Sequence, residues 1–230
     1  MVHERRSDDR LLTFAHPGRK FDDALALEDI ETGTLWSQPS GRAVDGPLTG
    51  SSLAVRPAVL TSFGEWVDAH PRTTYVRPQI DPRLPVHPTL LSRQDHLFDG
   101  GAMRSLVAVV GAGGERRAYS LAGRTTRHVQ HDRLGGVAIA VIFASDPVLL
   151  AAFATAPGSP PLHQGILRDV AGALELLDPA TGRRWAATSG HPIGGTHAAL
   201  VPLPLFPIRK EDLDLHFPEL GRGVKRRDRR

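Results

Sequence analysis

The sequence predicts a mainly β fold (a β-rich α+β fold) built from two related β-meander units with a few short helices. Glycine (23 residues) and proline (19) are abundant in this chain of 230 residues, which favours frequent turns over long helices. Apolar and polar residues alternate at 25–27 and again at 174–176, as they do in half-buried strands. The stretch that begins at Leu25 also recurs from Leu174, which indicates a duplicated supersecondary unit.

The two copies share the residues that are expected to set their strands and turns. Each begins with a Leu-x-Leu strand, and a Thr-Gly pair follows where a tight hairpin turn needs a residue with positive φ. A tryptophan then returns on the second strand, and a Ser-Gly pair marks a second turn. In the first copy, the residues that recur are Leu25, Leu27, Asp29, Thr32, Gly33, Trp36, Ser40, Gly41 and Gly46.

Other elements are expected outside the two copies. Residues 106–121 predict a hairpin with a glycine-rich tip, and 137–143 predict a strand that is buried on both faces. Short helices are expected at 65–69, at the Ala- and Leu-rich stretch 148–156 and at 211–216. A shared hydrophobic centre is expected from Leu25, Leu27, Trp36, Val137, Ile139, Val141, Phe143, Leu174, Leu176 and Trp185.

The chain is expected to have four parts. These are a partial first repeat unit (1–76), a Pro-rich linker (77–103), a second repeat unit (104–220) and a disordered basic tail (221–230). Because one half-unit is missing from the first copy, an exposed sheet edge is expected. A homodimer or another protein partner could cover that edge.

Composition excludes several classes of function. The chain has no cysteine, so disulfides, cysteine zinc sites, iron–sulfur clusters and thiol catalysis are ruled out, and no cofactor is predicted. A formal net charge of +3 and a tail without aromatic residues argue against nucleic acid as the partner. No apolar run is long enough to span a membrane, and the charged N-terminus shows no secretory signal, which predicts a cytoplasmic protein for the sequence as read and no particular location if the true start lies upstream.

Six motifs stand out in the sequence: Asp29–Gln38, Gly41–Gly50, Thr61–Trp66, His70-Pro71, Gly114–Leu121 and Asp132–Gly136. They resemble the motifs of an uncharacterised prokaryotic family, the domain-of-unknown-function family 3179, which suggests a bacterial source. The resemblance implies two copies of one unit, each with an Ala-Tyr-Pro-Leu half and a tryptophan half. Some members carry cysteine or selenocysteine in the first half, which implies redox chemistry. That half is absent here, so either this chain is a diverged non-redox member or its reading frame starts too late.

Two groups of residues are candidate sites. Trp36, Gln38, Arg42, Glu65 and Trp66 could line a ligand pocket, since an indole supplies an apolar wall and arginine grips anions. The alternative is a tryptophan that only closes each repeat. His128, His131 and Asp132 could bind a metal on a helical turn. On a strand, however, the two histidines would face opposite sides.

No coherent catalytic set is visible, and no catalytic residue is assigned. The sequence therefore favours a non-catalytic β-repeat module that binds a ligand or another protein. The alternative is a redox or metal-dependent enzyme whose thiol-bearing half is missing from this chain.

Overall fold

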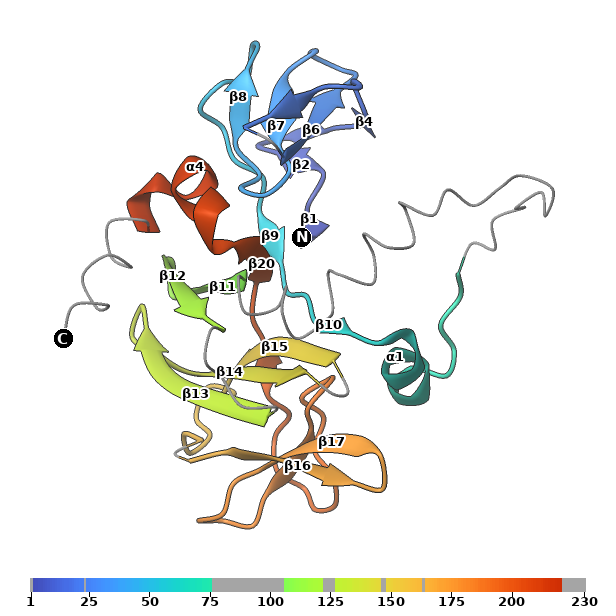
Figure 1. The fold of residues 1–230 in the computed structure, drawn as a ribbon, viewed down its shortest axis with the longest axis vertical. Coiled ribbons are helices and arrows are strands. Elements are labelled where there is room, and N and C mark those ends of the chain that lie inside the picture. Colours follow the sequence, from blue (N-terminus) through green and yellow to red (C-terminus); the bar gives the residue numbers. More distant parts are fainter. Residues whose placement is uncertain are drawn as a thin grey trace. The chain divides into compact units, whose positions relative to one another are not determined.

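The computed structural model describes residues 2–22, 24–75, 106–121, 127–145, 148–162 and 164–220. Within these ranges the chain is rich in short antiparallel strands and has few helices, which confirms the predicted mainly β fold (Figure 1). No helix in the described part of the chain is long and apolar enough to cross a membrane. The predicted linker, 77–103, and the predicted basic tail, 221–230, lie outside the described residues.

The chain forms two compact units, and each of them joins segments that are distant in sequence. Unit 1 consists of Met1–Ala58, Val107–Ser120 and Leu203–Arg230, and unit 2 consists of Val59–Leu106 and Leu121–Pro202. The hairpin β11 (Leu106–Ala112) and β12 (Glu115–Ser120) confirms the expectation for 106–121. Together with β20 (Leu205–Arg209) it forms a three-stranded sheet.

Unit 1 also contains small sheets from the N-terminal segment. The first pairs β1 (Val2–His3) with β9 (Val55–Arg56), and another pairs β2 (Arg6–Ser7) with β3 (Arg10–Leu11). The largest comprises β4 (Phe14–Ala15), β5 (Lys20–Phe21), β6 (Ala24–Asp29), β7 (Leu35–Ser37) and β8 (Ala43–Asp45). A short 3₁₀ helix, η1 (Lys210–Asp212), leads into α4 (Leu213–His216), which confirms the helix expected at 211–216.

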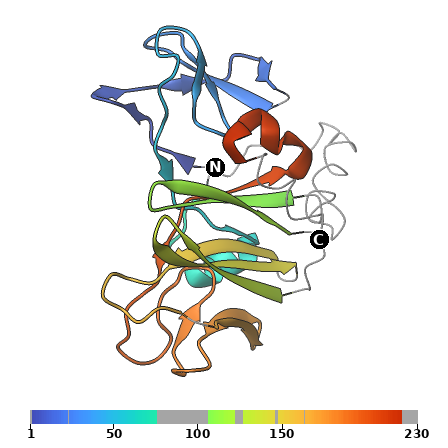
Figure 2. The ribbon, with the colours of Figure 1, turned by 90° about the vertical axis from the view of Figure 1, so that its left-hand side faces the viewer.

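Unit 2 packs a sheet against a hairpin, as Figure 2 shows. The sheet contains β10 (Leu60–Thr61), β13 (Arg127–Leu134), β14 (Val137–Ser145), β15 (Val148–Ala154) and β19 (Val201–Pro202). The facing strands are β16 (Ile166–Val170), β17 (Ala173–Leu177) and β18 (Arg184–Ala186). The helix α1 (Phe63–Ala69) confirms the expectation for 65–69, and its N-cap Ser62 accepts a hydrogen bond from the Glu65 amide.

The prediction of a helix over 148–156 is wrong, because this stretch is strand β15. Its composition favours a helix, but it pairs along its length with β14 and also with β10 and β19. Every residue from Leu149 to Ala154 is buried. Strand pairing on both edges satisfies backbone groups that would otherwise be buried without partners, so tertiary pairing overrides local propensity.

The prediction of one shared hydrophobic centre is also wrong. Trp36 packs with Leu12, Ala43 and Leu53 in unit 1, whereas Trp185 belongs to the apolar cluster of unit 2. Leu25 is 39% exposed and contributes little to either core.

The two tryptophan segments, 25–46 and 174–195, make matching backbone hydrogen bonds. Leu27 pairs with Trp36 as Leu176 pairs with Trp185. The amides of Gly33 and Gly182 donate to the carbonyls of Asp29 and Asp178, each at 2.8 Å. The four glycines at the two turns, Gly33, Gly41, Gly182 and Gly190, have φ between +69° and +72°. This is the left-handed region in which glycine alone is unstrained.

The turns at Gly33 and Gly182 are each closed by a fully buried aspartate, and this predicts a stability loss in acid. Burial alone would raise the pKa of Asp29, but hydrogen bonds from Trp36, Thr32 and Thr34 outweigh it, so its pKa is lowered. The pKa of Asp178 is lowered in the same way by Thr181 and Arg183. A carboxylate whose pKa is lower in the folded state stabilises the fold above its unfolded pKa of about 3.9.

The free energy of unfolding should therefore fall as the pH drops below about 4. Urea denaturation at stepwise pH measures this loss. Replacing both aspartates with asparagine should flatten the profile in that window. If the double variant lost stability in acid as steeply as the wild type, the assignment of this loss to Asp29 and Asp178 would be contradicted.

Candidate functional site

A pocket of about 310 Å³ in unit 1 collects polar side chains from segments far apart in sequence. We call it the polar pocket. This volume lies at the lower end of the range for small-ligand sites. Its polar lining residues are Asp22, Ser37, Ser40, Arg42, Thr49 and His216.

Two buried polar groups of this pocket, a serine and a histidine, are in contact. Ser37 ends strand β7 and is 2% exposed, and His216 ends helix α4 and is 5% exposed. The Ser37 Oγ and His216 Nδ1 atoms lie 3.4 Å apart. Buried polar groups are costly unless they are paired, so their convergence at a pocket marks a candidate site.

The second turn of the first copy places Ser40 and Arg42 at the same pocket. The Gly41 amide donates to the Ser37 carbonyl at 2.8 Å, and the Arg42 amide lies 3.4 Å from Ser40 Oγ. Gly41 is required here, because a Cβ atom would lie 2.6 Å from the ring of His3. The Arg42 side chain is exposed, and no carboxylate of a described residue forms an ion pair with it. Its guanidinium is therefore available to a ligand.

Trp36 and Gln38, the two other ligand-binding residues predicted in the first copy, contact neighbouring residues of the fold. Trp36 has no exposed surface, and its Nε1 donates to Asp29 Oδ2 at 2.8 Å. Gln38 presents its main-chain carbonyl to His3 Nε2 at 2.8 Å. Neither residue lines the polar pocket. The structure thus brings Arg42 together with Ser37 and His216, and not with the indole of Trp36.

Glu65 and Trp66 belong to unit 2, so the five predicted ligand-binding residues are divided between the two units. Trp66 lies 4.1 Å from the His70 ring, and its Nε1 donates to Thr73 Oγ1 at 2.9 Å. Trp66, His70 and Thr73 are among the residues that line a shallow hollow at the end of α1. Burial raises the pKa of Glu65, and the charges of Asp68 and Asp169 raise it further.

The three predicted metal ligands lie on strand β13 and do not converge. Side chains alternate along a strand, so His128 and His131 face opposite sides. His131 Nε2 lies 3.3 Å from the Gly165 carbonyl, and Asp132 Oδ1 accepts the Arg133 amide at 2.7 Å. Among the described residues, no group of three or more histidine, aspartate or glutamate side chains could hold a metal ion.

Most residues of the polar pocket were not predicted from the sequence. Ser37 and Arg42 carry a detectable signal, because the aligned positions of the second copy hold Ala186 and His191. No comparable signal exists for His216, which reaches the pocket only through the fold.

Comparison with known proteins gives one match. Residues 1–83 match the family described as "Protein of unknown function (DUF3179)". The matched stretch includes every lining residue of the polar pocket except those contributed by 215–218. Searches of the curated proteins and of the solved structures found no match. The N-terminal part of this chain therefore resembles that family, as its motifs indicated.

Proposed function

We propose that the chain is a non-catalytic binding module whose polar pocket holds a small molecule with an anionic oxygen group. The observation that carries the proposal is the convergence of buried Ser37 and His216 with the unpaired guanidinium of Arg42. Arginine donates in a planar fork that matches a carboxylate or phosphate. The hydroxyls of Ser40 and Thr49 add hydrogen-bonding groups around the same space.

Asp22 narrows the ligand class further. Its carboxylate lines the pocket that also holds Arg42, so a purely anionic ligand would meet a like charge. A zwitterion avoids this conflict, because its amine can approach Asp22 while its acid group lies at Arg42. We therefore favour a small amino-acid-like ligand over a simple anion.

Comparison of the two tryptophan segments supports the assignment of the binding site to the first segment. Both copies keep the same turns, but the second copy has Ala186 and His191 where the first has Ser37 and Arg42. We propose that an ancestral unit was doubled and that the polar pocket belongs to the first copy alone. The predicted partner at a sheet edge stays a prediction.

Calorimetric titration with β-alanine and with acetate tests the ligand class. β-Alanine is expected to bind at least about tenfold more tightly than acetate, since it adds one charge-assisted contact. Arg42→Gln should weaken both ligands by about tenfold or more. Asp22→Asn should remove the preference for β-alanine, since it weakens β-alanine binding and relieves the like-charge repulsion on acetate.

Arg19→Gln is the matched control, because Arg19 is an exposed arginine of unit 1 that does not line the pocket. Equal losses in Arg19→Gln and Arg42→Gln would show nonspecific charge attraction and would contradict the proposal. Hydrolysis of p-nitrophenyl acetate that disappears in Ser37→Ala would overturn its non-catalytic part.

A further inference from the structure

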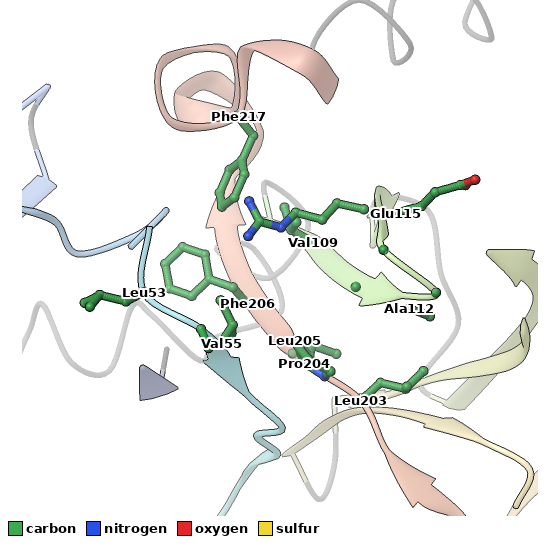
Figure 3. A pocket seen from close by; sticks show the side chains of 15 residues that line it. Leu53, Val55, Val109, Ala112, Glu115, Leu203, Pro204, Leu205, Phe206 and Phe217 are labelled. Atoms are coloured by element: carbon green, nitrogen blue, oxygen red, sulfur yellow. The ribbon is translucent and has the colours of Figure 1, made fainter. Parts of the chain in front are cut away.

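A second pocket of unit 1 has the opposite character, since most of its lining is apolar. It has a volume of about 460 Å³ and lies between the β11–β12 hairpin, β20 and the segment Leu53–Val55 (Figure 3). We call it the apolar pocket. The buried side chains of Leu53, Val109, Leu205 and Phe217 line it together with the partly buried Val55 and Phe206.

Only two charged side chains, Arg116 and Glu115, are found among the residues that line this pocket. They are neighbours on strand β12 and therefore lie on opposite faces of it. Figure 3 shows Glu115 pointing away from Phe206 and Phe217. The guanidinium of Arg116 lies over the Phe217 ring, 5.9 Å from its centroid. The charge that faces the apolar lining is thus positive.

The position of Arg116 leaves its hydrogen-bonding edge available. At 5.9 Å from the ring centroid the guanidinium lies within cation–π range of Phe217, and this contact uses none of its N–H donors. No ion pair links Arg116 to a carboxylate within the described part of the chain. A ligand that buries an apolar body against Val109 and Phe206 could therefore place an acidic group on Arg116.

We propose that the apolar pocket binds an amphiphilic anion, that is, a molecule with a short hydrocarbon body and one carboxylate or sulfonate group. The volume lies within the usual range for small-ligand sites, and the apolar lining with one directional cation matches their usual composition. This site is distinct from the polar pocket, because the two pockets share no lining residue.

Titration with octanoate, 1-octanol and octylamine tests the proposal. Octanoate is expected to bind about tenfold more tightly than octanol, because only octanoate gains a charge-assisted contact with Arg116. Octylamine is expected to bind most weakly. Arg116→Gln should reduce the preference for octanoate over octanol to less than about twofold. Equal affinity for octanoate and octanol in the wild type would overturn the proposal.

Arg117→Gln is the matched control, since Arg117 carries the same charge on the opposite face of β12. It should keep the octanoate preference, and its loss in both variants would show long-range attraction instead of a site. Arg42→Gln should also leave octanoate binding unchanged, which separates this proposal from that for the polar pocket.

A filling variant tests the location independently of charge. Gly111 lines the pocket and pairs with Arg116 across the hairpin. A Cβ added there would meet nothing closer than 3.8 Å, so the backbone accommodates the Cβ of Gly111→Val at the wall of the pocket. It should weaken octanoate and octanol alike by about tenfold. Unchanged binding by the folded variant would place the ligand elsewhere and overturn the proposal.

The pKa of His3, measured by NMR, reports whether an anion is bound at Arg116. Burial lowers this pKa, and the positive charge of Arg116 lowers it further. An anion bound at Arg116 offsets that charge, so octanoate should raise the pKa of His3 in an NMR titration whereas octanol should not. A shift of equal size with octanol would contradict binding of the acid group at Arg116.

Discussion

Replacing Gly190 with alanine is expected to destabilise unit 2 by about 3 kcal/mol or more. Gly190 has a φ of +72°, which costs an L-residue about 1–2 kcal/mol. The larger effect is steric, because an added Cβ would lie 2.9 Å from a ring carbon of Phe153. It would also lie 3.1 Å from the carbonyl oxygen and Cβ of Leu200. Both neighbours are buried in the core of unit 2 and have little room to move.

The variant Gly182→Ala separates the cost of a positive φ from the cost of steric contact in the core. Gly182 belongs to the same copy and has a nearly identical φ of +69°, but no atom lies within 4 Å of its added Cβ. Its substitution should therefore cost only about 1–2 kcal/mol, the cost of the positive φ alone. Amide hydrogen exchange of β14 and β17 measures both variants within unit 2 itself. Equal costs would show that backbone conformation alone, and not close packing, makes Gly190 necessary.

The local parts of the fold could be predicted because their determinants are neighbours in sequence. Gly33 and Gly182 lie at their expected turns, and the hairpin that ends at Ser120 follows from its glycine-rich tip. The first of these turns also sets Trp36 opposite Leu27. Such features depend on a few adjacent φ angles and on alternation, and both are written directly in the sequence.

The remaining parts of the fold depend on which distant segments pair with one another. The alternation of apolar and polar residues in the sequence does not carry that information. Strand β15 was predicted as a helix because Ala and Leu favour helices, and only its flanking strands decide otherwise. The sequence likewise does not show that β20 joins β11 in unit 1. For the polar pocket, Arg42 was predicted from its chemistry. His216 was not, because it reaches Ser37 from the far end of the chain.

Removing the carboxylate of Asp29 is expected to be among the most destabilising single changes in unit 1, costing about 3–5 kcal/mol in Asp29→Ala. Asp29 has no exposed surface, and it accepts Trp36 Nε1 at 2.8 Å and the Thr32 amide at 2.6 Å. Its loss would leave these donors buried without a partner, beside a cavity. Asp29→Asn keeps the shape and one acceptor oxygen, so it should cost about 1–3 kcal/mol.

Asp178→Ala is the matched control, because Asp178 is equally buried at the aligned position of the second copy. Its partners differ, since Trp185 Nε1 donates to the Ala198 carbonyl instead. The loss of Asp178 would therefore leave the indole paired, and Arg183, whose side chain is 18% exposed, could turn toward water. A smaller loss of about 1–3 kcal/mol is expected. Urea denaturation followed by the fluorescence of Trp36 and Trp185 compares the two variants. Equal losses would show that the tryptophan contact of Asp29 contributes nothing beyond the turn itself.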